Sequence, residues 1–182
     1  MWTAWATAEP TAVRPNPPRS SLDYLWSPWR YKYLTTAERS ADCIFCAMAA
    51  SPDHDREFLV VYRGKYNFIV LNRFPYTSGH LMVVPYVHTP DLAGIDAETT
   101  AEMMELVRRS EVSLRALYRP DGLNLGMNIG ESAGAGIAGH IHMHVLPRWW
   151  GDANFMTTVG ETRVLPEELA VTWLRLRDAF GC

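Results

Sequence analysis

The fold is decided by the stretch His140-Ile141-His142-Met143-His144-Val145-Leu146-Pro147. Histidines occupy alternate positions at its start, and apolar residues stand between them. Because side chains of a β-strand alternate between two faces, this pattern predicts a strand that carries three imidazoles on one face. Ile141, Met143 and Val145 would point the other way, into a core. Pro147 is expected to end the strand, since proline cannot donate to a sheet ladder.

Three neighbouring imidazoles are costly as inert packing, because each buried ring needs partners for both nitrogens and charged rings repel. The three histidines could bind a catalytic metal, as three-His zinc sites do. Alternatively, one could act as a nucleophile while its neighbours orient it. The preceding loop, residues 128–139, contains four glycines and lets backbone N–H groups approach a phosphate. This neighbourhood favours phosphate chemistry.

The surrounding pattern predicts an α+β fold. Strands are expected at 58–63 and 66–72, joined by a hairpin at Gly64-Lys65, and at 79–85, 123–129 and 140–146. A long helix would follow Asp96 as N-cap and bury Met103, Val107, Ser110, Leu114 and Leu117, with Glu98, Glu102 and Glu105 on its solvated face. A C-terminal helix is expected at 164–180, with Pro166 in its first turn. The order indicates an antiparallel sheet of about five strands with helices packed on it.

Composition bounds the class of protein. The 182 residues are 48% hydrophobic and carry a net charge of -3, which fits one globular domain and offers no basic groove for a nucleic acid polymer. Four prolines in residues 1–20 predict a disordered or extended tail, which leaves 21–182 as a single domain. The sequence has no apolar stretch long enough for a membrane span and no secretory signal pattern, so we expect a cytoplasmic protein.

The cysteines suggest a metal half-site. Their number, three, does not indicate a disulfide framework. Cys43-Ile44-Phe45-Cys46 fits either two metal ligands or a redox pair, and a closed zinc site would need two further ligands. A thioredoxin-like pair is less favoured, because the segment is not expected to open a helix after a strand.

With these elements in place, the sequence resembles the histidine triad (HIT) family. Gly139–Arg148 is similar to the family signature, Gly79–Pro85 to its central strand and Asn128-x-Gly130 to its phosphate-side loop. The cysteine pair resembles the zinc half-site of many bacterial members. The likeness covers roughly residues 22–180. Within the family, Asn72–Tyr76 and Pro147–Phe155 resemble the branch of diadenosine tetraphosphate phosphorylases.

The resemblance implies a role for each residue of the site. His142 would attack the α-phosphate and form a nucleotidyl-histidine, and His144 would hold it in the right tautomer. Asn128 and the loop amides around Gly136 would bind phosphate oxygens. Asn72 stands where many members have an acid that binds the ribose.

The resemblance also implies a structural zinc ion and a homodimer. Zinc would be held by Cys43, Cys46, His88 and His140, and the apolar face of the long helix would meet a second copy. One departure is visible at Ala135-Gly136, where most members carry phosphate-binding Gln, Ser or Thr side chains.

Three further residues are candidates for contacts near the substrate. His80 begins a strand and could lie close to the histidine run or be a strand-end residue. Arg148 could bind a distal phosphate. Trp149 could stack on a base, although packing is an equally good interpretation.

The expected function is nucleotidyl transfer from a dinucleoside polyphosphate, with phosphorolysis of diadenosine tetraphosphate to ATP and ADP as the first candidate. Hydrolysis of the same substrate or of a nucleoside phosphoramidate is the alternative within the family. Outside it, a metal-dependent enzyme with a three-His centre and a nucleotide-binding sensor without turnover remain open.

Overall fold

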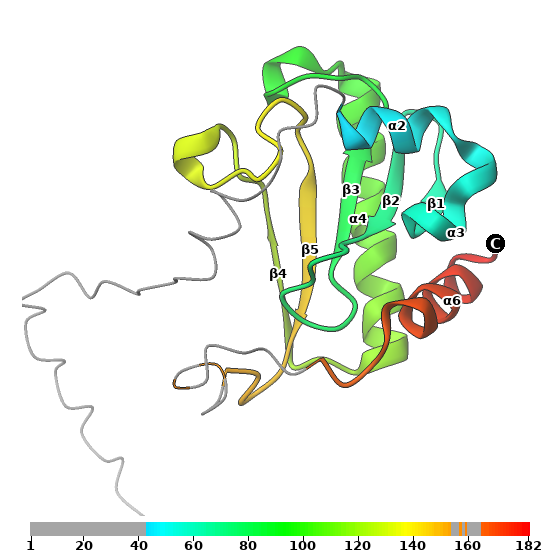
Figure 1. The fold of residues 1–182 in the computed structure, drawn as a ribbon, viewed down its shortest axis with the longest axis vertical. Helices are drawn as coiled ribbons and strands as arrows, with labels where there is room; N and C mark the ends of the chain where they lie inside the picture. The colour runs from blue at the N-terminus through cyan, green and yellow to red at the C-terminus, as the bar shows by residue number, and fades with distance from the viewer. Residues whose placement is uncertain (1–42, 154–156, 158, 160–164) are drawn as a thin grey trace, which may run out of the picture.

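Residues 43–153, 157, 159 and 165–182 are described by the structure, a computed structural model. The tail expected at 1–20 lies outside them. Five strands of the described residues form one sheet in the order β1-β2-β3-β5-β4, and each neighbouring pair is antiparallel (Figure 1). The strands are β1 Val60–Arg63, β2 Asn67–Leu71, β3 Leu81–Pro85, β4 Gly122–Gly126 and β5 Met143–Arg148. The predicted α+β class and antiparallel sheet are confirmed.

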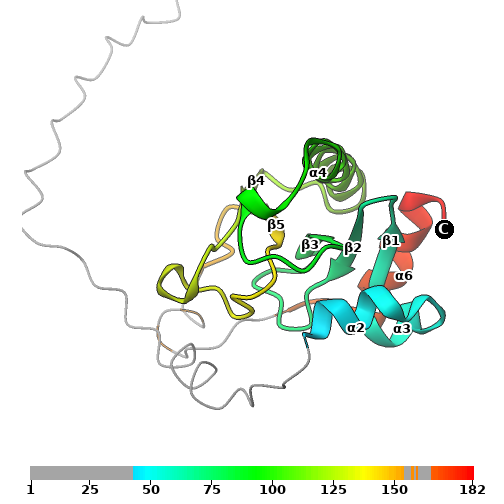
Figure 2. The ribbon, with the colours of Figure 1, turned by 90° about the horizontal axis from the view of Figure 1, so that it is seen from above.

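Helices cover both faces of the sheet. Helices α4 (Ala97–Tyr118) and α6 (Leu169–Phe180) pack with one face, while α2 (Ile44–Ala50) and α3 (Asp55–Phe58) lie on the other side (Figure 2). Three short 3-10 helices, Pro52–His54, Leu92–Gly94 and Glu131–Ala133, lie in the connections. In β2, Ile69 joins the α4 side of the core and its neighbour Val70 joins the α2 side. Successive side chains of a strand point to opposite faces, so the continuous apolar run of β2 contributes to two cores.

Helix α4 follows the predicted pattern. Asp96 is its N-cap, with Oδ1 accepting the Thr99 N–H at 2.7 Å. The predicted positions Met103, Val107, Ser110 and Leu114 are buried, and Leu117 is partly buried.

Glu102, expected on the solvated face of α4, instead binds the turn between β1 and β2. Its carboxylate accepts the backbone N–H groups of Lys65, Tyr66 and Asn67, each at 2.7 Å. The open amides of the hairpin turn form an anion-binding concavity, and the carboxylate that fills it comes from another element, helix α4.

The histidine run differs from its prediction in two ways. Strand β5 begins at Met143, because the chain at 140–142 turns towards the β3–α4 connection, where the Ile141 N–H donates to the Thr89 oxygen at 2.8 Å. Pro147 does not end the strand and pairs with Leu123 of β4. Pairing with β3 stops at Val145, so on that side the missing amide proton breaks no ladder bond.

The two ends of the described chain also differ from the prediction. The cysteine pair does open a helix, α2, with Cys43 at its N-cap position, and what precedes it lies outside the described residues. Helix α6 begins at Leu169, three residues after Pro166. Glu167 accepts hydrogen bonds from Tyr118 and Thr172, which holds this segment outside the helix.

None of the helices in the described ranges combines the length and the apolar character that a membrane crossing needs.

Candidate active site and metal site

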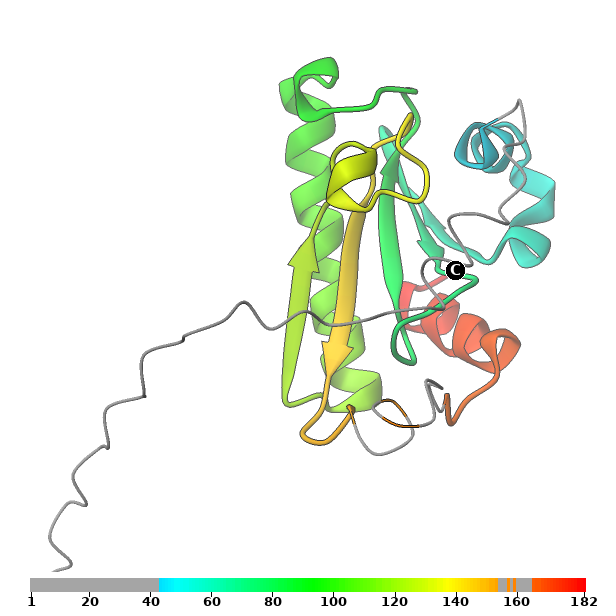
Figure 3. The same cartoon turned by 60° about the vertical axis from the view of Figure 1, so that its left-hand side comes forward.

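A cavity of about 340 Å³ lies beside the histidine run. Helix α2 and the loop between β4 and β5 lie at the same end of the sheet (Figures 1 and 3). Residues of both line the cavity. One part of the lining is apolar and the other is polar or glycine-rich. The lining residues include Ile44, Phe45, Met48, Phe58, Asn72, Arg73, Tyr76, Asn128, Gly136, Ile137, His142 and His144.

His142 is held in one tautomer by the residue two positions before it. Its Nδ1 lies 2.9 Å from the carbonyl oxygen of His140. Because a carbonyl only accepts, Nδ1 carries the proton and the lone pair remains on Nε2. Burial lowers the pKa of His142, partly offset by that hydrogen bond. The ring is therefore neutral at neutral pH and keeps a lone pair on Nε2, the form that a histidine nucleophile requires.

His144 stands next to His142 and has a buried partner of its own. Its Nδ1 lies 2.9 Å from Nε2 of His80, a side chain with no exposed surface. Burial, with a smaller effect of His142, lowers the pKa of His144 to about 4. The rings of His142 and His144 meet edge to face, with centroids 4.8 Å apart. The sequence left open whether His80 lies close to the histidine run or is a strand-end residue. The structure places it in contact with His144 of that run.

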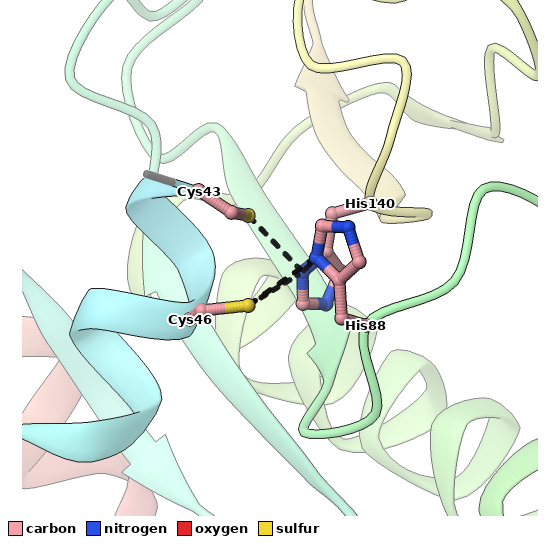
Figure 4. A group of neighbouring side chains, drawn as sticks. All are labelled: Cys43, Cys46, His88 and His140. Atoms are coloured by element: carbon pink, nitrogen blue, oxygen red, sulfur yellow. Dashed lines mark hydrogen bonds between the residues drawn. The ribbon is translucent and has the colours of Figure 1, made fainter. Parts of the chain in front are cut away.

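Cys43, Cys46, His88 and His140 place one ligand atom each within 4.8 Å of one another (Figure 4). Nδ1 of His140 lies 3.3 Å from Sγ of Cys43 and 3.7 Å from Sγ of Cys46. Nδ1 of His88 lies 3.3 Å from Sγ of Cys46 and from Nδ1 of His140. Tetrahedral zinc, with bonds of about 2.0–2.3 Å, needs ligand atoms about 3.3–3.8 Å apart. The residues present therefore fit a metal ion.

The second nitrogen of His140 supports this fit. Nε2 lies 2.9 Å from the carbonyl oxygen of Pro85, so it carries the proton and leaves the lone pair of Nδ1 facing the thiols. Burial lowers the pKa of His140, which also keeps the ring neutral. A neutral imidazole with a free nitrogen is the form that ligates metal.

The three histidines of the run do not share one target. Nδ1 of His140 faces the cysteines, Nδ1 of His142 is bonded to a carbonyl, and Nδ1 of His144 is bonded to His80. A three-His catalytic metal needs three nitrogens converging on one point. This arrangement disfavours that alternative.

The remaining predicted residues fall into two groups. Asn72, Asn128 and Gly136 line the cavity. Arg148 and Trp149 do not belong to its described lining. Arg148 binds Asp152 and Asn124 at the far end of β5, and Trp149 donates from Nε1 to the Tyr118 oxygen while lining a second hollow.

Sequence reasoning missed the apolar wall of the cavity. Ile44, Phe45 and Met48 come from α2, and the Phe45 ring packs 5.0 Å from the ring of His142 and 5.4 Å from that of His140. Their spacing on one helical face is visible in the sequence, but no helix was expected there, and Cys43 and Cys46 indicated metal binding instead. Arg73 was also missed, because nothing in its neighbourhood marks it as facing a cavity.

Comparisons with known proteins identify the same family that the sequence resembles. Residues 55–149 match the HIT domain family. The AP-4-A phosphorylase of Mycobacterium tuberculosis (strain ATCC 25618 / H37Rv) is 42% identical over 160 residues, which is 85% of this chain and 82% of that protein.

Solved structures share the fold. A zinc-bound histidine triad family protein from Mycobacterium smegmatis has a TM-score of 0.63 and 31% identity, covering 77% of this chain and 94% of that one. Plasmodium falciparum diadenosine triphosphate hydrolase has a TM-score of 0.57 at 16% identity, covering 69% of this chain and 78% of that one, and supports the fold alone.

Proposed function

Because the chain belongs to the HIT domain family, we propose that it cleaves diadenosine tetraphosphate with inorganic phosphate as acceptor, giving ATP and ADP. The observation that carries this proposal is the state of His142, whose Nε2 lone pair is free beside a cavity with one apolar and one polar wall. The similarity to a mycobacterial AP-4-A phosphorylase supports the choice of substrate.

In the first step, Nε2 of His142 attacks the α-phosphorus. The bond from that phosphorus to the bridging oxygen breaks, and ATP leaves as an anion. A terminal phosphate ester loses its second proton at about pH 6, so no proton transfer to the leaving group is needed at neutral pH. The positive charge that develops on the imidazole is stabilised by the hydrogen bond from Nδ1 to the His140 carbonyl.

In the second step, an oxygen of the phosphate dianion attacks the same phosphorus. The P–N bond breaks, its electron pair returns to Nε2 of His142, and ADP leaves. Dividing the transfer into two displacements replaces one difficult step by two easier ones.

The lining of the cavity favours phosphate over water as acceptor. Water must lose a proton when it attacks, so hydrolysis needs a base. The described lining contains no carboxylate, and Nδ1 of His144 is already bonded to His80. Phosphate dianion needs no such base. Arg73, the cation of the described lining, adds attraction for anionic ligands.

Substrate contacts follow from the same geometry. The apolar wall from α2 and Phe58 would cover the base, and Asn72 would lie at the ribose. Asn128 and backbone amides near Gly136 would bind phosphate oxygens, replacing the side chains absent at Ala135-Gly136. Arg148 and Trp149 stay predictions for the distal half of the substrate.

Zinc is the ion that we propose for the four-ligand site, on the basis of its two thiolates and two imidazoles. A zinc ion with four protein ligands supplies structural cross-linking and leaves no coordination position for substrate. Cys43 and Cys46 would tie α2 to His140, and His88 would tie the β3–α4 connection to both. Thiols of this kind persist in a reducing compartment, which supports the cytoplasm.

A homodimer is the proposed assembly. The apolar face predicted for the partner packs on the chain's own sheet, so it is not the interface. Met104 and Val112 of α4 are exposed instead, and β4, at the end of the sheet, exposes Leu125. Within the described residues β4 has a neighbour on one side only, and an open strand edge together with exposed apolar side chains is a surface suited to a second copy.

The test is to incubate the full chain with diadenosine tetraphosphate, with and without phosphate, and to identify the products by chromatography. ATP and ADP formed only with phosphate support the proposal. AMP and ATP would show hydrolysis instead. Binding without any product would indicate a nucleotide sensor and overturn the proposal.

A further inference from the structure

The orientation of the Asn72 side chain is fixed by the backbone that follows it. Its Oδ1 accepts the N–H of Phe74 at 3.0 Å, so the other terminal atom is the amide nitrogen. That nitrogen, Nδ2, lies 3.2 Å from Nδ1 of His80. An amide nitrogen only donates hydrogen bonds, and Nδ1 of His80 therefore accepts.

His80 is thereby held in one tautomer. Its Nδ1 also accepts the backbone N–H of Tyr76 at 3.2 Å. A neutral imidazole that accepts at one nitrogen carries its proton on the other, which is Nε2. Nε2 lies 2.9 Å from Nδ1 of His144, so His80 donates to His144.

The tautomer of His144 follows from that of His80. With Nδ1 accepting, the proton of the neutral ring lies on Nε2. Burial keeps the pKa of His144 low, so the ring carries one proton at neutral pH. His144 lines the cavity next to His142, and its one N–H is thus available beside the nucleophile.

We infer that Asn72 is a positioning residue: its amide N–H holds His80 in the tautomer that keeps the proton of His144 on Nε2. The use of that proton, as a hydrogen bond to the phosphate oxygen that leaves, rests on the proposed function. The tautomer itself does not, and it exists in the protein without substrate.

Aspartate at this position reverses the polarity of the contact. A carboxylate only accepts, so it draws a proton onto Nδ1 of His80 in competition with the Tyr76 N–H. Nε2 of His80 then accepts from Nδ1 of His144, and Nε2 of His144 loses its proton. Aspartate keeps the shape of Asn72 and still accepts hydrogen bonds from ribose hydroxyls. Asn72→Asp therefore separates positioning from sugar contact.

The direct test is nitrogen NMR of the imidazoles in the full chain, without substrate, at neutral pH. In the wild type, His80 and His144 are both expected as Nε2–H tautomers. In Asn72→Asp, the ¹⁵N shifts of both rings move towards the Nδ1–H pattern. Asn124→Asp is the matched control, because Asn124 is exposed on β4 and contacts Arg148. An Asn72→Asp spectrum identical to the wild type overturns the inference.

A kinetic test distinguishes positioning from ribose binding. With diadenosine tetraphosphate, Asn72→Asp is expected to lower kcat at least about tenfold, as when a donor to a transition-state oxygen is lost, with KM nearly unchanged. The p-nitrophenyl ester of AMP, whose leaving group needs little stabilisation, should lose much less. A raised KM with an intact kcat would show a sugar contact only and contradict the inference.

The inference and the proposed function fail separately. If the wild type cleaves no nucleotide but the NMR shifts move as expected, the proposed function fails and the role of Asn72 stands. If Asn72→Asp melts well below the wild type, Asn72→Ala replaces it. That variant removes the donor without adding an acceptor and should give a smaller shift in the same direction; an unchanged spectrum again overturns the inference.

Discussion

The carbonyl oxygen of His140 accepts the Nδ1 proton of His142 at 2.9 Å, while the ring of His140 faces Sγ of Cys43 at 3.3 Å. One residue thus contributes its side chain to the candidate metal site and its backbone to the proposed nucleophile. Phe45 packs against both rings from α2, the helix that Cys43 and Cys46 anchor. Disturbing the metal site should therefore move the nucleophile as well.

Cys46→Ser is expected to lose most of the bound metal and to lower both the melting temperature and turnover, the latter by about tenfold or more. The reason is that α2, freed from His140, no longer packs against His142. Metal content by atomic absorption, a thermal melt with and without chelator, and initial rates check this. Cys182→Ser is the matched control, because that thiol is exposed and lies outside the cluster. Full metal occupancy in Cys46→Ser would disprove the ligand assignment.

Substitution of the nucleophile should abolish chemistry and leave binding. His142→Asn is expected to lower kcat by at least about 10⁴-fold, because asparagine cannot form the covalent intermediate that is proposed on His142. The affinity for AMP, measured by calorimetry, should change little. His54→Asn serves as control, since His54 is exposed and paired with Glu57. Without phosphate the second step cannot occur, so mass spectrometry of the wild type incubated with diadenosine tetraphosphate alone should find the nucleotide on His142; an adduct on another residue would refute the assignment.

Glu102→Ala should lower the free energy of unfolding by about 3 kcal/mol. It removes a half-buried carboxylate that accepts three backbone N–H groups and the side-chain amide of Asn67. Urea denaturation measures the change. Glu98→Ala, an exposed position on the same helix, is expected to change stability by less than about 0.5 kcal/mol. Equal effects of the two substitutions would show that the turn does not depend on Glu102.

The sequence predicted the sheet well, because the continuous apolar runs of β2 and β3 and the alternation that leads into β5 are local properties of each segment. Through a motif with fixed spacing it also singled out the four residues that the fold gathers into one cluster, and it proposed His142 as the nucleophile. The sequence did not predict contacts between segments that are far apart in the chain. Glu102 looked solvated because its partners, the amides of 65–67, are far away in sequence. Helix α2 was missed for a similar reason, since Phe45 and Met48 become a cavity wall only when packed against the sheet.

Asn72 illustrates the same limit inside the site. Its position suggested a ribose contact, and the geometry adds a hydrogen bond to His80 that no spacing in the sequence indicates. Residue types and motifs identify which residues belong to a site. Tautomers depend on donors and acceptors that the folded backbone brings together, and they follow only from distances.

Burial of His144 should make the native state less stable in acid. The folded pKa of His144 is about 4, below the ordinary value of 6.5, because burial opposes the charged form. Between pH 6.5 and 4, His144 is therefore protonated in the unfolded chain but not in the native state. The free energy of unfolding falls as the pH is lowered through this window. The contribution of this one group is about 3 kcal/mol, fully present above pH 6.5 and lost by about pH 4.

His144→Asn should remove that part of the pH dependence. We expect its free energy of unfolding to fall less steeply than that of the wild type between pH 7 and 4.5, measured by urea denaturation. Protonation of the metal ligands also destabilises both proteins in this range, so the difference between the two curves isolates His144. Parallel curves would mean that His144 protonates in the native state as readily as in the unfolded chain, which would contradict the lowering of its pKa by burial.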